Sequence, residues 1–145
     1  RDLLKAAAML HDIGKFIDYS QHHKHALYLL SNMSLPGYNN DERDIIAHTA
    51  RYHRKSNPKA SHIEFQRLSA RKQDTIIKLS VLLRIADSLD RSYSSSITGL
   101  RGTKIDARRW RMGFDTNAES QMERWAFNRK KESFEKVFDT TLELE

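Results

Sequence analysis

The sequence predicts a mainly α-helical domain over residues 1–95, followed by a small α+β module over residues 96–145. Apolar residues recur with a helical period as far as Leu89. Serines gather at residues 92–96, and apolar and polar residues then alternate over 108–114 and 142–145. Because such alternation is typical of half-buried strands, we expect two to four strands packed on one helix.

The first two expected helices carry most of the histidines. The first helix leads to His11 and should end at Gly14, and its inward face is formed by Leu4, Ala7, Ala8 and His11. The second begins at the histidine-rich run 22–25 and buries one side as far as Met33. His11 and His22 should therefore both point toward the core.

Two further helices complete the first part. One should begin at a cap formed by Asn40 or Asp41 and continue to Tyr52, because acidic residues in a first turn favour a helix start. The other begins near Ser69 and is dense in apolar residues over 76–89, without breakers. It is expected to be central and mostly buried.

The last third of the chain has a different pattern. One strand is expected over 108–114, with an apolar side formed by Trp110, Met112 and Phe114. A last strand should cover 142–145. A helix over 119–138 should turn six apolar residues toward the sheet, namely Met122, Trp125, Ala126, Phe134, Val137 and Phe138. These elements make a small α+β module.

Composition excludes several classes of protein. The chain has 145 residues, 39% of them hydrophobic, which is enough for a sizeable core. It has no cysteine, so disulfides and thiolate metal sites are excluded. No run approaches the roughly 18 consecutive apolar residues of a membrane span, and the start does not resemble a signal peptide. We therefore expect a cytoplasmic protein that does not enter membranes.

The adjacent pair His11-Asp12 follows the first helix and has two interpretations. In one, the imidazole is neutral and satisfied by neighbouring groups, while Asp12 caps the helix end. In the other, His11 and Asp12 are two ligands of one divalent metal ion, which requires the backbone to turn beneath them. A metal site would need a third ligand.

Asp87 is the candidate third metal ligand, near the end of the long helix. Asp90 follows it at i+3 and could act as a catalytic base or tune the site. The cation beside these carboxylates could instead be Arg84 or Arg91. Carboxylate and imidazole donors suit Mg²⁺, Mn²⁺, iron or Zn²⁺.

Positive charge gathers between residues 51 and 72. The chain carries a net charge of +6, and in this segment seven basic residues face only Glu64. Such a surface attracts polyanions, although it could also be a solvated face. The candidate anion-binding residues are His22, His25, Arg51, His53, Arg54, Lys55, Lys59, Arg67, Arg71 and Lys72. Nucleic acid is not the favoured polyanion, because no groove-reading motif is present and the tryptophans are expected in the core.

The chain resembles the C-terminal half of the exopolyphosphatase/guanosine pentaphosphate phosphohydrolase family. The resemblance extends over essentially the whole chain, and its most specific parts are the Arg51–Lys55 run and the Leu-Pro-Gly-Tyr sequence at 35–38. The pair His11-Asp12 and the Ala86-Asp87 context also resemble the HD superfamily of metal-dependent phosphohydrolases. The first part would then be an HD-type helical domain.

The resemblance implies where activity resides. In the family, phosphate is hydrolysed in N-terminal actin-like domains that bind phosphate and magnesium, so these 145 residues are expected to be a C-terminal region. The HD pattern also has a histidine upstream of the His-Asp pair, and none precedes His11 in this chain. The parent protein is expected to hydrolyse phosphoanhydride bonds.

Three functions are compatible with these observations. The favoured one is a polyphosphate-binding or regulatory region, not sufficient for activity by itself, that also helps to form a homodimer and whose ligand is polyphosphate or a guanosine polyphosphate. The second is an HD phosphohydrolase in which His11, Asp12 and Asp87 hold a divalent ion. The third is a structural dimerisation module that keeps the same residues as a hydrogen-bond network.

Overall fold

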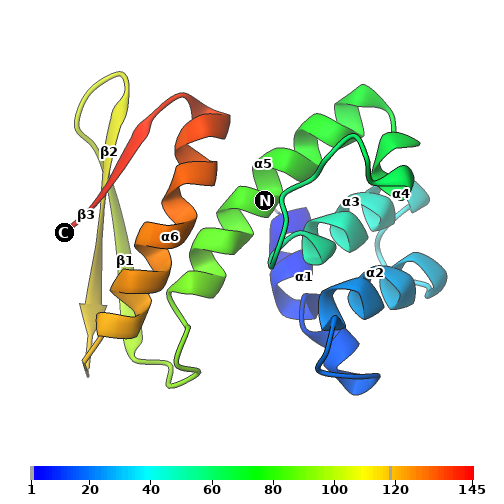
Figure 1. The fold of residues 1–145 in the computed structure, drawn as a ribbon, viewed down its shortest axis with the longest axis horizontal. Helices are drawn as coiled ribbons and strands as arrows, with labels where there is room; N and C mark the ends of the chain where they lie inside the picture. Colours follow the sequence, from blue (N-terminus) through cyan, green and yellow to red (C-terminus); the bar gives the residue numbers. More distant parts are fainter. Residues whose placement is uncertain (1, 118) are drawn as a thin grey trace. The chain divides into compact units, whose positions relative to one another are not determined.

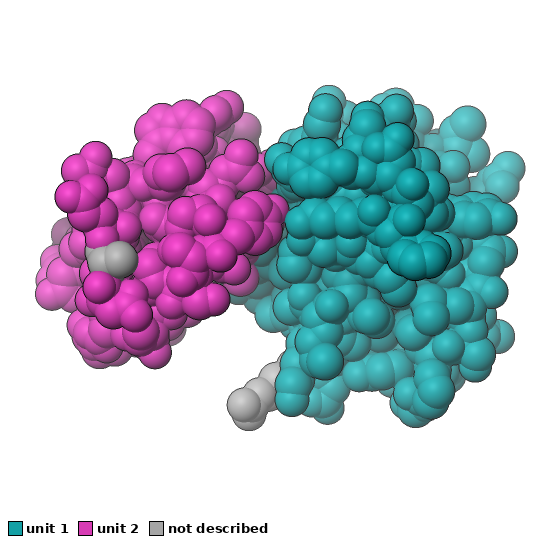
Figure 2. All heavy atoms as spheres, turned by 90° about the horizontal axis from the view of Figure 1, so that it is seen from below, with its two compact units in different colours: residues 1–83 teal, residues 84–145 magenta. Residues whose placement is uncertain are grey.

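The computed structural model describes residues 2–117 and 119–145 and divides into two compact units (Figures 1 and 2). Unit 1 comprises residues 1–83 and unit 2 comprises residues 84–145, so the division falls within the longest helix, α5 (Ala70–Ser88). The domain boundary that the sequence predicts, at 95/96, lies later in the chain and stays a prediction. No helix in the described residues is long and apolar enough to cross a membrane.

The regular elements of unit 1, within the residues that the structure describes, are all helices. Its elements before α5 are α1 (Asp2–Leu10), the short 3₁₀ helix η1 (Ile13–Phe16), α2 (His22–Asn32), α3 (Asn40–Arg51) and α4 (Ile63–Gln66). The four long helices expected in this part of the chain are confirmed, whereas η1 and α4 lie in segments that the periodicity did not resolve. Together with the sheet of unit 2, this makes the chain an α+β protein that contains more helix than strand.

Helix α3 forms the centre of unit 1. It packs against both α1 and α2. Its side chains at Ile46, Ala47 and Ala50 are fully buried, and they meet Ala7 from α1 and Leu30 from α2. Small residues at these positions let the helix backbones approach closely, so the ends of the three helices are held in fixed positions.

The start of α3 differs from the sequence prediction by one residue. The cap is Asn39, not Asn40 or Asp41. The Asn39 side chain accepts a hydrogen bond from the Glu42 backbone N–H at 3.0 Å, and the Glu42 carboxylate accepts one from the Asn39 N–H at 2.9 Å. This reciprocal pairing satisfies two backbone N–H donors. Asn39 therefore caps the helix in place of Asn40 or Asp41.

Unit 2 is a three-stranded sheet with one helix beside it (Figure 1). Its strands are β1 (Ile97–Lys104), β2 (Arg109–Thr116) and β3 (Thr141–Leu144), and α6 (Gln121–Phe138) connects the last two. β2 lies in the middle, antiparallel to β1 and parallel to β3. The predicted module of two to four strands on one helix is confirmed.

The helix α6 buries only part of the expected face, because Ala126 is buried and Phe134 packs against the core as predicted. Phe127 is fully buried and packs with Phe114 of β2 and Leu142 of β3. Met122 and Trp125 are both 57% exposed, so the expectation that they face the sheet is wrong. The apolar residues of α6 are spread around the helix, and the buried face is the one that carries Phe127, while Trp125 stacks instead against the Arg129 guanidinium at 4.8 Å.

Candidate metal centre

Three helix ends bring together the four side chains of the candidate centre. His11 and Asp12 follow α1, His22 opens α2, and His53 comes two residues after α3 ends. We call these four residues the histidine–aspartate cluster. Because packing on α3 fixes the three helices, residues 42 positions apart in the sequence reach one point in unit 1.

Gly14 makes the approach of η1 to α2 possible. A β-carbon at this position would lie 1.9 Å from the His22 carbonyl oxygen and 2.6 Å from the Ala26 backbone nitrogen. The sequence assigned Gly14 to the end of a helix, but it lies inside η1 and is needed for close contact. This contact sets the distance between Asp12 and His22.

The cluster has the dimensions of a metal site. The Nε2 atom of His22 lies 3.3 Å from Asp12 Oδ1, and that of His53 lies 3.9 Å from the same oxygen. The Nε2 atom of His11 lies 3.7 Å from Asp12 Oδ2. One ligand atom each from His11, Asp12 and His53 can be chosen so that all three lie within 4.8 Å of one another. A single ion could therefore contact these three residues after small side-chain adjustments, with His22 beside them.

Backbone carbonyls hold each of the three imidazoles in one tautomer. The Nδ1 atom of His11 donates to Ala8 O at 2.6 Å, and that of His53 donates to Ala50 O at 2.6 Å. His22 Nδ1 likewise donates to a carbonyl, that of Tyr19, at 2.9 Å. Since a carbonyl only accepts, the proton is on Nδ1, and the Nε2 atom of a neutral ring presents its lone pair. Metal-binding histidines are typically oriented in this way.

The Nε2 atoms of His22 and His53 face each other inside the cluster. Their Nε2 atoms are 3.3 Å apart. Burial lowers the pKa of His53 to about 3, so this ring is neutral near pH 7. Two lone pairs at this distance repel each other unless a proton or a metal ion lies between them. Imidazole nitrogens together with one carboxylate fit Zn²⁺, Mn²⁺ or Fe²⁺ better than Mg²⁺, which prefers oxygen.

The carboxylate of Asp12 is ionised and has a resident cation. Burial by itself would raise its pKa, but the hydrogen bond from Lys15 and the nearby imidazoles outweigh burial, so the pKa of Asp12 lies below its usual value. Lys15 Nζ donates to Asp12 Oδ2, with the two residues one turn apart. Sequence reasoning did not single out Lys15, although its i+3 spacing from Asp12 could have indicated the pair.

Asp87 and Asp90 lie in unit 2. Burial lowers the pKa of Arg84, and the negative charge of Asp87 opposes this lowering. This agrees with the ion-pair interpretation of the sequence. Asp90 lies beyond the end of α5, not on it as expected, and its Oδ1 accepts the Ser95 backbone N–H at 3.3 Å. Metal binding by Asp87 and a catalytic role for Asp90 stay predictions.

A cavity of about 300 Å³ borders the cluster. We call it the α2 cavity, and its lining residues are Tyr19, Ser20, Gln21, His22, His23, Arg54 and Lys55. His22 belongs both to the cavity and to the cluster. Burial, and then the positive charge of Arg51, lowers the pKa of His23 to about 4, so His23 acts as a neutral group there. The cavity therefore combines two cationic side chains with neutral hydrogen-bonding groups, which suits a phosphate.

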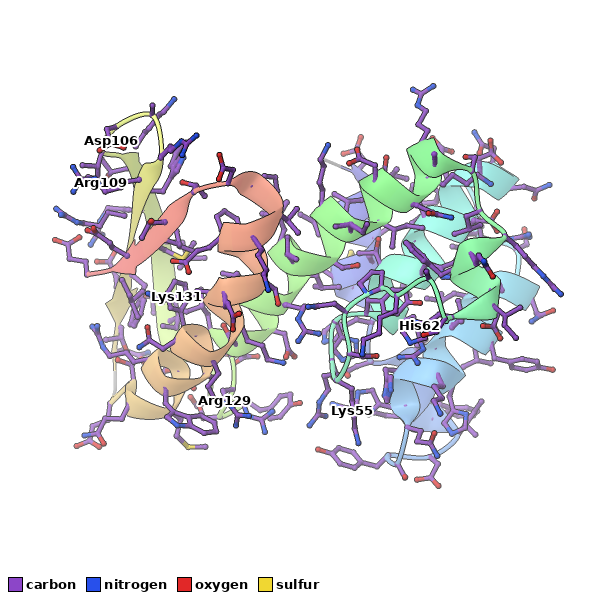
Figure 3. The ribbon with its side chains drawn as sticks, turned by 45° about the horizontal axis from the view of Figure 1, so that its top comes forward. Lys55, His62, Asp106, Arg109, Arg129 and Lys131 are labelled. Carbon is purple, nitrogen blue, oxygen red and sulfur yellow. The ribbon has the colours of Figure 1, made fainter. Side chains whose placement is uncertain are left out.

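The other predicted anion-binding residues occupy different environments. Lys59, Arg67 and Arg71 are exposed and make no ion pair within residues 2–117 and 119–145. Figure 3 shows Lys55 and His62 in the segment that links α3 to α4. Lys72 is neutralised by Asp41 at 2.7 Å and Asp44 at 2.8 Å.

Arg51 and His25 are less accessible than the exposed basic residues. Arg51 is half-buried, and its guanidinium lies over the Tyr52 ring at 5.3 Å. His25 is also half-buried on α2 and does not line the cavity. We use the name basic edge for the exposed residues Lys59, Arg67 and Arg71.

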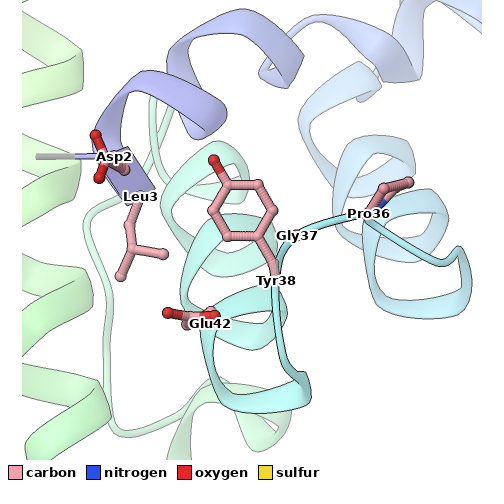
Figure 4. A pocket seen from close by; sticks show the side chains of 6 residues that line it. All are labelled: Asp2, Leu3, Pro36, Gly37, Tyr38 and Glu42. Carbon is pink, nitrogen blue, oxygen red and sulfur yellow. The ribbon is translucent and has the colours of Figure 1, made fainter.

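A second hollow of about 460 Å³ lies beside the Leu-Pro-Gly-Tyr turn (Figure 4). Gly37 adopts φ +87°, which an L-residue rarely tolerates, and the turn presents Tyr38 toward the start of α1. Among the described residues, its lining includes the carboxylates of Asp2 and Glu42 and no basic side chain. The two carboxylates would repel a phosphate.

Comparisons with known proteins identify the family of the chain. The family model for domain III of Ppx/GppA phosphatases matches residues 1–132. The chain belongs to the Ppx/GppA phosphatase family. The match to its third domain confirms the predicted C-terminal region of that family and leaves only the last residues of unit 2 outside the matched range.

Two curated relatives are similar to part of the chain. The guanosine-5'-triphosphate,3'-diphosphate pyrophosphatase of Pseudoalteromonas translucida (strain TAC 125) is 46% identical over 52 residues. The enzyme of the same name from Pseudoalteromonas atlantica (strain T6c / ATCC BAA-1087) is also 46% identical over 52 residues. In both, the match spans 36% of this chain and 10% of the relative. The chain therefore matches about a tenth of the length of these relatives.

Proposed function

We propose that unit 1 binds the phosphate groups of a polyphosphate or a guanosine polyphosphate, beside a divalent ion held by the histidine–aspartate cluster. The hydrolytic site of the parent protein would lie in its other domains, and this region would bind or regulate. One observation carries the proposal: His22 is shared by a cluster of converging metal-type donors and by a cavity that contains Arg54 and Lys55. The printed name of the relatives supports a guanosine polyphosphate as ligand.

The chemistry of each part supports the proposal. Arg54 and Lys55 supply charge-assisted hydrogen bonds to phosphate oxygens in the cavity. Lys59, Arg67 and Arg71 add exposed positive charge that can follow a longer chain of phosphates. A bound divalent ion would neutralise further phosphate oxygens. A long polyphosphate would use the cavity and the edge, whereas pyrophosphate would use the cavity alone.

Two charge-removing variants separate the cavity from the edge. Arg54→Gln with Lys55→Gln should weaken the binding of both pyrophosphate and long-chain polyphosphate. Lys59→Gln, Arg67→Gln and Arg71→Gln together should weaken long-chain binding by about tenfold or more at low salt and flatten its salt dependence by roughly two units of slope, with pyrophosphate binding unchanged. Calorimetric titration across a salt series measures both quantities.

The matched control removes three positive charges from unit 2, by replacement of Lys104, Arg129 and Lys136 with glutamine. These residues are exposed and lie outside the site. If the control weakens polyphosphate binding as much as the edge variant does, the attraction comes from net charge alone and the proposed surface is wrong. Unchanged binding in both the edge and the cavity variants would reject the proposal equally.

A second function is favoured by the geometry of the cluster itself, namely metal-dependent hydrolysis of a phosphate ester at this site. Three Nε2 atoms and a carboxylate converge next to the phosphate-binding cavity. When bound there, a divalent ion would supply Lewis-acid activation of water and phosphate. Arg54 and Lys55 would orient the phosphate toward the cluster, and Asp12 would keep its negative charge next to the ion.

Turnover decides between binding and hydrolysis. With Mn²⁺ present, a hydrolytic site should release phosphate from guanosine nucleotides or pyrophosphate, and Asp12→Asn should lower the rate by at least about 100-fold. Release is measured colorimetrically on the purified chain, with Asp74→Asn as the control for an exposed aspartate far from the cluster in sequence. Binding without turnover would support the non-catalytic function, whereas equal turnover in both variants would show a contaminating phosphatase.

A further inference from the structure

Lys15 lies between the histidine–aspartate cluster and the α2 cavity. Its ammonium donates to Asp12 Oδ2, the oxygen that also lies 3.7 Å from His11 Nε2. The same ammonium is 5.8 Å from the centre of the Tyr19 ring, and Tyr19 lines the cavity. The Lys15 side chain is 30% exposed, so it can change conformation without disturbing the core. One cation is thus within reach of both sites.

We propose that Lys15 exchanges partners, holding Asp12 while the metal is absent and binding a phosphate group in the α2 cavity once a metal ion has taken its place. The inference rests on the proposed function, because it needs both the metal centre and the phosphate site. It assigns to Lys15 a role that neither the family match nor the names of the relatives describe.

Electrostatics gives the reason for the exchange. A divalent ion and an ammonium at the same carboxylate repel each other strongly in a partly buried site. The ion also neutralises the negative charge of Asp12, so the Asp12 carboxylate no longer attracts the Lys15 ammonium strongly. Its four-carbon chain is flexible, and the ammonium already lies 5.8 Å from the ring of Tyr19, which lines the proposed phosphate cavity.

Exchange couples the two ligands. A metal ion that displaces Lys15 from Asp12 makes the ammonium available to phosphate, so phosphate should bind more tightly to the metal-loaded protein. Thermodynamic reciprocity then requires that phosphate tighten metal binding by the same factor. A lysine that merely oriented Asp12 for the metal would have the opposite effect on metal affinity.

Lys15→Met tests the exchange, with Lys5→Met as the matched control on the exposed side of α1. Mn²⁺ affinity is measured by electron paramagnetic resonance, first in anion-free buffer and then with sulfate as a stand-in for a phosphate group. Without anion, Lys15→Met should bind Mn²⁺ roughly tenfold more tightly than the wild type, because a competing charge is removed. Sulfate should tighten Mn²⁺ binding in the wild type and in Lys5→Met, but clearly less in Lys15→Met.

Three other results of the Mn²⁺ experiment would contradict the proposal. Weaker or unchanged Mn²⁺ affinity in Lys15→Met overturns the exchange, since it shows that Lys15 supports the ligand set or has no influence on it. An equal effect of sulfate in all three proteins overturns the phosphate-binding role of Lys15. Failure of wild type and variant alike to bind Mn²⁺ rejects the metal centre, and so the proposed function itself, which is a distinct outcome.

Discussion

Replacement of Gly14 by alanine should destabilise unit 1 by about 3 kcal/mol or more. This is the largest stability effect that we expect from the addition of one methyl group. The added β-carbon would lie 1.9 Å from the His22 carbonyl oxygen, and this neighbour is backbone that cannot rotate away. η1 would have to move off α2, which would also separate Asp12 from His22. Denaturant unfolding followed by circular dichroism measures the loss.

Gly102→Ala is the matched control for Gly14→Ala. A β-carbon on Gly102 meets nothing within 4 Å, and the residue lies on β1 in unit 2. Its free energy of unfolding should change by no more than about 0.5 kcal/mol. Equal stabilities of the two variants would show that η1 and α2 are not in the close contact on which the cluster depends.

Asp12→Asn should reduce the affinity for Mn²⁺ or Zn²⁺ by at least about 100-fold, because it removes the only carboxylate in the histidine–aspartate cluster and replaces an anionic ligand by a neutral amide of the same size. The side chain is 29% exposed, so the substitution should not unfold the protein. Calorimetric titration of the purified, chelator-treated chain gives the affinity and the number of ions bound.

The control for Asp12→Asn is Asp74→Asn, which removes an equally charged side chain that is exposed on α5 and paired with Lys78 at 2.7 Å. Its metal affinity should equal that of the wild type. If both aspartate variants bind metal as the wild type does, the ion is held by histidines elsewhere on the surface, and the assignment of the cluster as the metal centre fails.

Local signals predicted most of the fold. The apolar period that defines α2 and α5, and the alternation that defines β2 and β3, are properties of neighbouring residues, so they can be read without tertiary information. The pair His11-Asp12 was a candidate metal site for the same reason, since both residues follow one helix. Chemistry carried by adjacent residues is the kind that sequence reveals most directly.

Contacts between distant segments were not predictable. His22 and His53 were expected only to bind anions, because their convergence on Asp12 depends on the packing of α1 and α2 against α3. The exposure of Trp125 depends on which face of α6 meets the sheet, and its apolar residues are spread around the helix. The pairing of Lys72 with Asp41 likewise joins residues 31 positions apart.

The most direct test of the metal centre is a crystal structure of the chain grown with Mn²⁺ and sulfate, with anomalous diffraction data. The account predicts one anomalous peak within bonding distance of Asp12 and of Nε2 atoms from at least two of His11, His22 and His53, with sulfate in the α2 cavity. A structure without a metal peak at Asp12, or with the ion bound only at other residues, would contradict it.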